Sequence, residues 1–215
     1  MGGQPLSVGR IIRTDADVSE GAAWLAQHDP VLARAYAATG PLPLRRRPDG
    51  FGQLLSAIVS QQVSTASARA IWGRLQDAGV DTVQGVKALD EAELRALGLS
   101  RQKARYAQAL AAAEIDFDAL REQPDDHVIK TLTAVTGIGV WTAEIYVMFS
   151  LGRADVFAPG DLALQEAARV LYDLPERPKE RALRQMAQNW SPWRSVAARL
   201  LFAYYRHAKQ RDGIS

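Results

Sequence analysis

The stretch of sequence that decides the fold is residues 132–161, LTAVTGIGVWTAEIYVMFSLGRADVFAPGD. Apolar residues at helical spacing precede its Gly-Ile-Gly segment, and an almost wholly apolar run, residues 141–151, follows it. This pattern predicts two helices joined by a hairpin at residues 135–140. Because glycine tolerates positive φ, the chain turns tightly there and leaves bare amide groups at the start of the second helix. Such a helix start is a small anion site that suits a phosphate.

One carboxylate stands at a fixed distance from this hairpin. Asp161 follows Pro159-Gly160, 22 residues after Gly139, at the start of another apolar helical pattern. Aspartate is also a favoured N-cap, and a lone Gly-x-Gly is more often a plain turn between helices. Trp141, just inside the second helix of the hairpin, adds a third feature. The three together favour a functional site over a plain turn and cap.

Length and composition exclude several classes of protein. The 215 residues suffice for one sizeable core or for two small lobes, and 47% hydrophobic with 23% charged residues is ordinary for a globular domain. No apolar stretch is long enough to predict a membrane span, and the N-terminal residues lack the apolar centre of a signal peptide. We therefore expect a cytoplasmic location.

The cysteine count and the charge limit the chemistry further. The chain has no cysteine, which excludes disulfides, thiolate zinc sites and thiolate-held iron–sulfur clusters. No acidic cluster suggests a catalytic metal, so we expect neither a metal nor another cofactor. A net charge of +2 and a pI of about 9.0 permit nucleic-acid binding without requiring it.

The pattern of apolar residues predicts an all-α fold. Helical spacing recurs at about ten places along the chain, and no convincing pair of strands is present. We expect the helices to form two lobes around a cleft. Residues 1–18 have few packing signals and are expected to form an N-terminal arm. Ser19-Glu20 is then expected to begin the first helix of a domain that spans residues 19–215.

A second polar feature stands between two apolar helical patterns, in the run Ser60-Gln61-Gln62-Val63-Ser64. Its last serine is a typical N-cap for the helix that follows. The two glutamines lie either at a cleft or in a solvated turn, and the residues alone favour neither. The basic run at residues 45–47 contacts phosphates or, as is more common for such runs, forms a solvated linker.

Four blocks of the sequence resemble one family. The pattern L-x-x-x-x-G-I-G-x-W-T-A is present in Leu132, Gly137, Ile138, Gly139, Trp141, Thr142 and Ala143, and a V-F-x-P-x run precedes Asp161. The other blocks are AIVSQQVSTASARA at 57–70, LGLSRQKARY at 97–106 and WSPWRSVAARLLFAYY at 190–205. In this order they resemble the helix-hairpin-helix/Gly-Pro-Asp superfamily of DNA glycosylases, and within it the DNA-3-methyladenine glycosylase II (AlkA) family.

The resemblance implies an enzyme of base excision repair that acts on double-stranded DNA in a DNA-binding cleft between the two lobes. Its reaction would be hydrolysis of the N-glycosidic bond of alkylated bases of the 3-methyladenine and 7-methylguanine type. Bifunctional relatives carry a Schiff-base lysine two residues after the second glycine, and Trp141 stands at that position. A monofunctional enzyme without lyase activity is therefore implied. We expect a monomer, associated with the nucleoid through DNA, without the additional N-terminal β-domain of some relatives.

The resemblance also assigns roles to individual residues. Asp161 would be the catalytic carboxylate, which stabilises the positive charge on the sugar and orients the attacking water. The residues expected at the substrate base are Trp141, Phe202, Tyr146 and Gln61. Gln62 would be the plug, the residue that fills the gap left in the DNA stack by the flipped base, and Val63 would be the wedge beside it. The other residues expected to bind DNA are Gly137, Ile138, Gly139, Thr142 and Lys103.

Some assignments keep an alternative. Phe202 stands where many relatives have a pocket tryptophan, and it is equally well explained as a core phenylalanine. Ile145 replaces a pocket tyrosine of some relatives, with Tyr146 next to it, so the range of lesions stays open. Lys103 is otherwise an ordinary surface lysine. Two other functions also stay open. One is a non-enzymatic DNA-binding module, which needs the hairpin but not Asp161; the other is a glycosylase of the same fold for another lesion.

Overall fold

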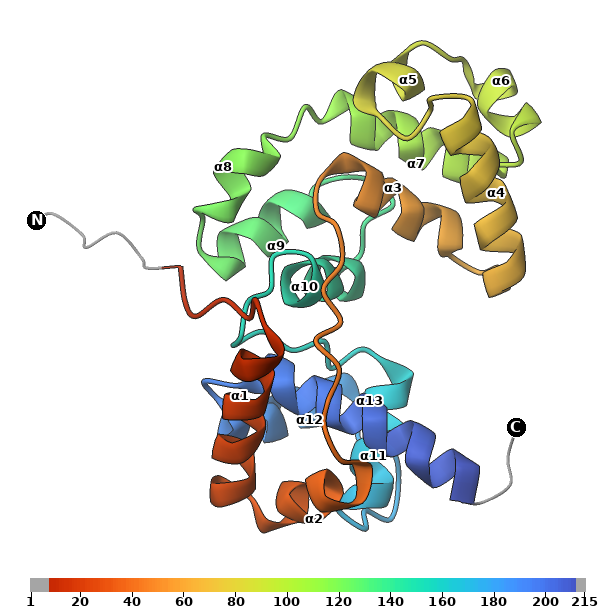
Figure 1. Ribbon diagram of the computed structural model, residues 1–215. Helices are drawn as coiled ribbons and strands as arrows, with labels where there is room; N and C mark the ends of the chain where they lie inside the picture. The colour runs from red at the N-terminus through yellow and green to blue at the C-terminus, as the bar shows by residue number, and fades with distance from the viewer. Residues whose placement is uncertain (1–7, 212–215) are drawn as a thin grey trace, which may run out of the picture. The chain divides into compact units, whose positions relative to one another are not determined.

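The computed structural model describes residues 8–211. Within that range the regular elements are helices, apart from an isolated antiparallel bridge between Ile11 and Arg153. The chain divides into two compact units, one formed by residues 47–146 and the other by residues 8–46 together with 147–211 (Figure 1). The predicted all-α fold is confirmed. None of the described helices is long and apolar enough to cross a membrane.

The first unit is built around α3 and α7. Its helices, in chain order, are α3 (Phe51–Ser60), α4 (Thr65–Asp77), α5 (Val83–Lys87), α6 (Glu91–Ala96), α7 (Arg101–Ala112), α8 (Phe117–Arg121), α9 (Asp125–Thr133) and the start of α10 (Val140–Phe149). α7 lies against α3, α5 and α6, and α3 also lies against α4. The apolar stripe of α3 is buried: Phe51, Leu54, Leu55, Ile58 and Val59. At roughly 1.5–3 kcal/mol for each large apolar side chain, this burial fixes the position of α3.

Serine side chains begin two helices of this unit. Ser64 accepts a hydrogen bond from the N–H of Ser67 at 3.2 Å and begins α4, as the sequence predicts. Ser100 accepts one from the N–H of Lys103 at 3.3 Å and begins α7. Each cap satisfies one of the amide groups that a helix start leaves without a partner. The chain therefore turns between α3 and α4 within residues 61–63, which we call the plug turn.

The second unit is built around its C-terminal helix. Its helices are α1 (Asp15–His28), α2 (Pro30–Thr39), the end of α10, α11 (Leu162–Leu171), α12 (Glu180–Met186), the 3₁₀-helix η1 (Ala187–Trp190) and α13 (Arg194–Arg211). α13 lies against α11, α2 and α1 (Figure 1). Gly21 lets α1 approach this core closely, because a Cβ atom at that position would lie 2.6 Å from the ring of Trp193.

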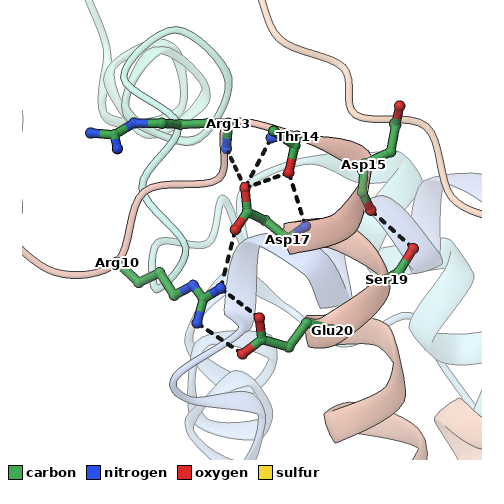
Figure 2. Close-up of polar contacts among 7 residues, drawn as sticks. All are labelled: Arg10, Arg13, Thr14, Asp15, Asp17, Ser19 and Glu20. Carbon is green, nitrogen blue, oxygen red and sulfur yellow. Dashed lines mark hydrogen bonds and ion pairs between the residues drawn. The ribbon is translucent and has the colours of Figure 1, made fainter.

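The first helix begins four residues earlier than the sequence predicts. Thr14 and Asp17 form a capping box, in which the N–H of Asp17 donates to Thr14 Oγ1 at 3.3 Å and the N–H of Thr14 donates to Asp17 Oδ2 at 2.9 Å (Figure 2). Arg10 adds ion pairs to Asp17 and to Glu20, at 3.1 and 2.5 Å. This box makes Asp15, rather than Ser19, the first residue of α1.

The predicted N-terminal arm is therefore wrong for the residues of it that the structure describes. Ile12 is fully buried, and its N–H donates to the carbonyl of Gly152 at 2.7 Å. The carbonyl of Arg10 accepts from the N–H of Ala154 at 2.9 Å. These bonds join residues 10–12 to residues 152–154 within the second unit, and α1 follows directly. Residues 1–7 of the predicted arm lie outside the described residues.

Candidate active site

The Gly-Ile-Gly hairpin lies between α9 and α10, where the sequence predicts it. The N–H of Ile138 donates to the carbonyl of Val135 at 3.0 Å, which closes the turn. Gly137 has φ of 99°, whereas Gly139 is outside the left-handed region. The expected positive φ therefore holds for the first glycine only. The side chain of Ile138 is buried, and its amide is used within the turn, so this residue anchors the hairpin.

The two glycines of the hairpin are needed for different reasons. A Cβ atom at Gly137 would lie 2.3 Å from Cγ of Tyr106, so packing and backbone conformation both require glycine there. A Cβ atom at Gly139 would meet nothing within 4 Å. The second glycine thus keeps the outer face of the hairpin bare rather than relieving a contact. A bare face lets another backbone or a phosphate come close to the amide groups.

The predicted anion site falls at the start of α10, and anion binding there stays a prediction. The carbonyl of Gly139 accepts from the N–H of Ala143 at 3.0 Å, so the first amide groups of the helix have no acceptor within it. Val140 and Trp141, at the same helix start, are 48% and 47% exposed. Thr142, by contrast, is buried. The helix dipole favours negative charge at this end.

The plug turn has an unusual backbone. Gln62 has φ of 55°, the left-handed region that residues other than glycine seldom adopt. Such a conformation costs about 1 kcal/mol or more and persists only where the surroundings impose it. The side chain of Gln62 is exposed, and Val63 is 39% exposed. The turn thus exposes the two residues to which the resemblance assigns the roles of plug and wedge, and these roles stay predictions.

The other two polar residues predicted near this turn have bonds inside the unit. Gln61 caps the C-terminal end of α3, and its side-chain Nε2 donates to the carbonyl of Gly137 at 3.0 Å. Lys103 is 9% exposed, and its ammonium donates to the carbonyl of Val59 at 2.7 Å. Burial lowers the pKa of Lys103 below its ordinary value. The base contact predicted for Gln61 and the DNA contact predicted for Lys103 stay predictions.

Tyr146 is a buried residue of the first unit. Its hydroxyl accepts the N–H of Gly50, the residue before α3, at 2.7 Å. Burial raises the pKa of Tyr146 to about 12, so this hydroxyl stays protonated at neutral pH. The ring lies 6.4 Å from the ring of Phe117. These contacts hold the start of α3, and a role for Tyr146 against a substrate base stays a prediction.

Asp161 is the N-cap of α11 in the second unit. Its Oδ1 accepts from the N–H of Ala163 at 2.8 Å and from the N–H of Leu164 at 3.2 Å. Just before it, the carbonyl of Pro159 accepts from the side chain of Gln165 at 2.8 Å, and this bond fixes the approach to the helix. Both capping bonds use the same carboxylate oxygen.

Phe202 lies on α13 in an environment rich in arginine. The guanidinium of Arg45 lies over its ring at 5.0 Å, and the ring of Phe149 is 6.4 Å away. Arg199 lies on the same helix and is fully buried. Its Nε donates to the carbonyl of Leu44 at 3.0 Å. Its burial and the positive charges of Arg45 and Arg46 lower the pKa of Arg199 to about 10.

Arg199 is a residue that sequence reasoning missed. Its Nη1 donates to the carbonyl of Ser195 at 2.9 Å and to the hydroxyl of the same serine at 2.7 Å. The four-residue spacing of serine and arginine on one helix is the signal that could have found it. Arg199 holds the segment that carries the basic run at residues 45–47. Tyr106 was missed as well, since nothing in the sequence shows that it lies against the hairpin.

The predicted site residues thus divide between the two units. The first unit holds the hairpin and plug-turn residues with Lys103, Trp141, Thr142 and Tyr146, and the second holds Asp161 and Phe202. Among the described residues, no group of three or more His, Cys, Asp or Glu side chains is placed to hold a metal ion. The groups available for chemistry are the amide groups at a helix start, an exposed turn, a half-exposed indole and one carboxylate at a helix N-terminus.

Residues 55–192 match the family described as HhH-GPD superfamily base excision DNA repair protein. The chain belongs to this superfamily. The matched range includes the plug turn, the hairpin and Asp161. The pair α9 and α10, with the Gly-Ile-Gly hairpin between them, also lies within it. The catalytic role of Asp161 that the resemblance implies stays a prediction.

Individual HhH-GPD relatives are similar over most of the chain. DNA-3-methyladenine glycosylase 2 of Escherichia coli is 32% identical over 195 residues, which cover 84% of this chain and 66% of that protein. A crystal structure of DNA-3-methyladenine glycosidase from Bacillus halodurans has a TM-score of 0.78 and 33% identity, and covers 91% of this chain and 92% of that one. The 3-methyladenine DNA glycosylase Mag1 of Schizosaccharomyces pombe, in complex with abasic DNA, has a TM-score of 0.75 and 27% identity, and covers 85% of this chain and 95% of that one.

Proposed function

We propose that this protein is a monofunctional DNA glycosylase that excises alkylated bases of the 3-methyladenine and 7-methylguanine type from duplex DNA. The observation that carries the proposal is Asp161, a carboxylate held at the start of α11 in a chain of the HhH-GPD superfamily. The relatives named above are DNA-3-methyladenine glycosylases, which supports the choice of lesion. The enzyme would act in the cytoplasm, on DNA of the nucleoid, as a monomer.

Binding would begin at the phosphate backbone. The bare face at Gly139 and the first amide groups of α10 would hold a phosphate beside the lesion, a contact that positions DNA without reading sequence. Extruding the damaged base costs roughly a few kcal/mol in lost stacking and pairing. Gln62 and Val63 would fill the space that the base leaves. Glutamine at this position would also replace part of the lost hydrogen bonding, since its amide both donates and accepts.

The chemical step would need little acid catalysis. A purine alkylated at N3 or N7 carries a positive charge, so it leaves with the electron pair of the C1′–N bond without first gaining a proton. Positive charge then develops on the sugar, and the carboxylate of Asp161 would stabilise it. Water would add its oxygen to C1′ and lose a proton to this carboxylate or to solvent. The products are a free base and an abasic site in an intact strand.

Trp141 supports both the substrate class and the absence of strand cleavage. Its indole is half-exposed at the start of α10, and an indole face attracts a cationic ring by stacking and by cation–π interaction. The same position would hold the amine of a Schiff-base lysine in a bifunctional enzyme. An indole forms no Schiff base, so attack on C1′ would come from water. Phe202 would add a second aromatic surface for the base.

The experiment that tests the proposal is base release from duplex DNA treated with a simple methylating agent. We expect the protein to release 3-methyladenine or 7-methylguanine. We also expect the strand to stay intact until alkali cleaves the abasic sites. Strand cleavage without alkali would contradict the monofunctional mechanism. Binding to the methylated duplex without release of either base would contradict the lesion assignment, and a wider set of lesions would then separate another glycosylase from a binding module.

A further inference from the structure

We infer that Gln61 and Lys103 are positioning residues that join the plug turn and the hairpin into one rigid element, so that a phosphate seated on the hairpin sets the position of Gln62. The inference rests on the proposed function in one respect only, namely that both segments contact DNA. Every contact that carries it lies within the first unit.

The first link is the bond from Gln61 to the hairpin. The side-chain Nε2 of Gln61 donates to the carbonyl of Gly137 at 3.0 Å, although the two residues are 76 positions apart in the sequence. Gly137 packs closely against Tyr106, because a Cβ atom added to it would lie 2.3 Å from Cγ of that ring. Gln61, the residue beside the plug, is therefore bonded to a closely packed residue of the hairpin.

The second link is the bond from Lys103 to the end of α3. Its ammonium donates to the carbonyl of Val59 at 2.7 Å, in the last turn of the helix that leads into the plug turn. The last carbonyls of a helix lack partners within it, and a cation is favoured there. Lys103 in turn lies at the start of α7, where Ser100 fixes the backbone through its cap. The plug turn is thus held at its entry as well as at Gln61.

These polar links matter because apolar packing does not support the turn on this side. A cavity of about 270 Å³ lies between the plug turn and the start of α7, and Gln62, Val63, Gln102 and Tyr106 are among the residues that line it. This pocket is partly open to solvent, so the turn lacks packing contacts on that side. We therefore expect the left-handed backbone of Gln62 to depend on the two hydrogen bonds beside it.

The test is a double-mutant cycle read by DNA affinity. Dissociation constants are measured at one fixed salt concentration for an undamaged duplex and for a duplex that contains a tetrahydrofuran abasic analogue. The ratio of the two constants gives the preference of the protein for DNA that lacks a base. The variants are Gln61→Met, Gln62→Ala and the pair together. Gln84→Met, an exposed glutamine on α5, is the matched control.

We expect Gln61→Met to lower the preference about fivefold, which corresponds to roughly 1 kcal/mol, the usual value of one neutral hydrogen bond. Its affinity for undamaged duplex should change less than twofold. In the Gln62→Ala background the same change should alter the preference less than twofold, because Gln61 acts through Gln62. A residue that only stabilises the fold would not show this non-additivity.

Lys103→Met tests the same inference from the other end of the turn, should Gln61→Met fail to fold. It too should lower the preference in the wild-type background and not in the Gln62→Ala background. Equal effects of either variant in both backgrounds, or no effect in the wild-type background, would overturn the inference. Failure of the proposed function would look different: no methylated base would be released, while the preference for the abasic analogue and its coupling persisted.

Discussion

The side-chain amide of Gln61 donates a hydrogen bond to the carbonyl of Gly137 at 3.0 Å. This contact joins two motifs that the sequence keeps far apart, the plug turn after α3 and the hairpin before α10. It also uses the glutamine side chain within the protein. The two segments that we propose to contact DNA therefore have a direct structural connection.

The two glycines of the hairpin should respond oppositely to alanine. Gly137→Ala should lower the free energy of unfolding by about 2–3 kcal/mol, because the new methyl group meets Tyr106 and φ is positive. Gly139→Ala should leave stability within about 0.5 kcal/mol, because nothing lies within 4 Å, yet it should weaken binding to undamaged duplex. Urea unfolding and fluorescence anisotropy measure the two effects. Unchanged DNA affinity in Gly139→Ala would argue against phosphate binding at the bare face.

The burial of Lys103 should appear in the pH dependence of stability. Its pKa is below 10.5 in the folded protein and close to 10.5 in the unfolded chain. Between these values the unfolded chain binds more protons, so the free energy of unfolding should rise with pH across that window. Relative to Lys103→Met, the wild type should gain stability as pH rises toward 10.5 in urea titrations. A difference between the two proteins that stays constant with pH would contradict this, and Lys130→Met, at an exposed lysine of α9, is the control.

The capping box at the start of α1 should contribute to stability and be lost in acid. Hydrogen bonds from the backbone of Arg13 and from Arg10 and Thr14 hold the pKa of Asp17 well below its ordinary value. Since the folded value is the lower one, this contribution is complete above pH of about 4 and is lost as pH falls below it. Asp17→Ala should lower the free energy of unfolding at pH 7 by about 1 kcal/mol. Asp15→Ala, the exposed acid of the same turn, should have a smaller effect, and equal effects would contradict the role of the box.

Trp141 should matter for the substrate more than for the fold. Its side chain is half-exposed, so Trp141→Ala should retain cooperative unfolding and affinity for undamaged duplex. The single-turnover release of methylated purines should fall about 10- to 100-fold, since aromatic contact with a base contributes roughly 1–3 kcal/mol. Trp24→Ala, at a partly exposed tryptophan of α1, should release these bases at the wild-type rate. Equal loss in both variants would point to general destabilisation instead.

Local features of the fold could be predicted from the sequence because their causes are local. The apolar spacing of α9 and α10, the Ser64 cap and the Asp161 cap each depend on residues within a few positions of one another. The same reasoning failed at α1. There the capping box has aspartate where glutamate or glutamine is more usual, and the partner of Ile12 is the distant Gly152.

The hydrogen-bond partners of the site residues could not be predicted from the sequence, because they depend on long-range contacts. The sequence marked Gln61 and Lys103 as polar residues in matching blocks, but their partners, Gly137 and Val59, come close only through tertiary packing. The burial of Tyr146 has the same origin, since its hydroxyl meets Gly50 at the start of a distant helix. Residue type and spacing therefore indicated which segments matter, while the bonding of each side chain needed the structure.

The most direct test of the central claim is the single-turnover release of methylated purines by wild type and by Asp161→Asn. Asparagine caps a helix as well as aspartate does, so the variant should keep the thermal stability and DNA affinity of the wild type. Asp126→Asn, at an exposed acid of α9, controls for the change in charge. We predict that Asp161→Asn releases base at least about 100-fold more slowly, because the carboxylate no longer stabilises the positive sugar. Release at the wild-type rate by Asp161→Asn would contradict the assignment of Asp161 as the catalytic residue.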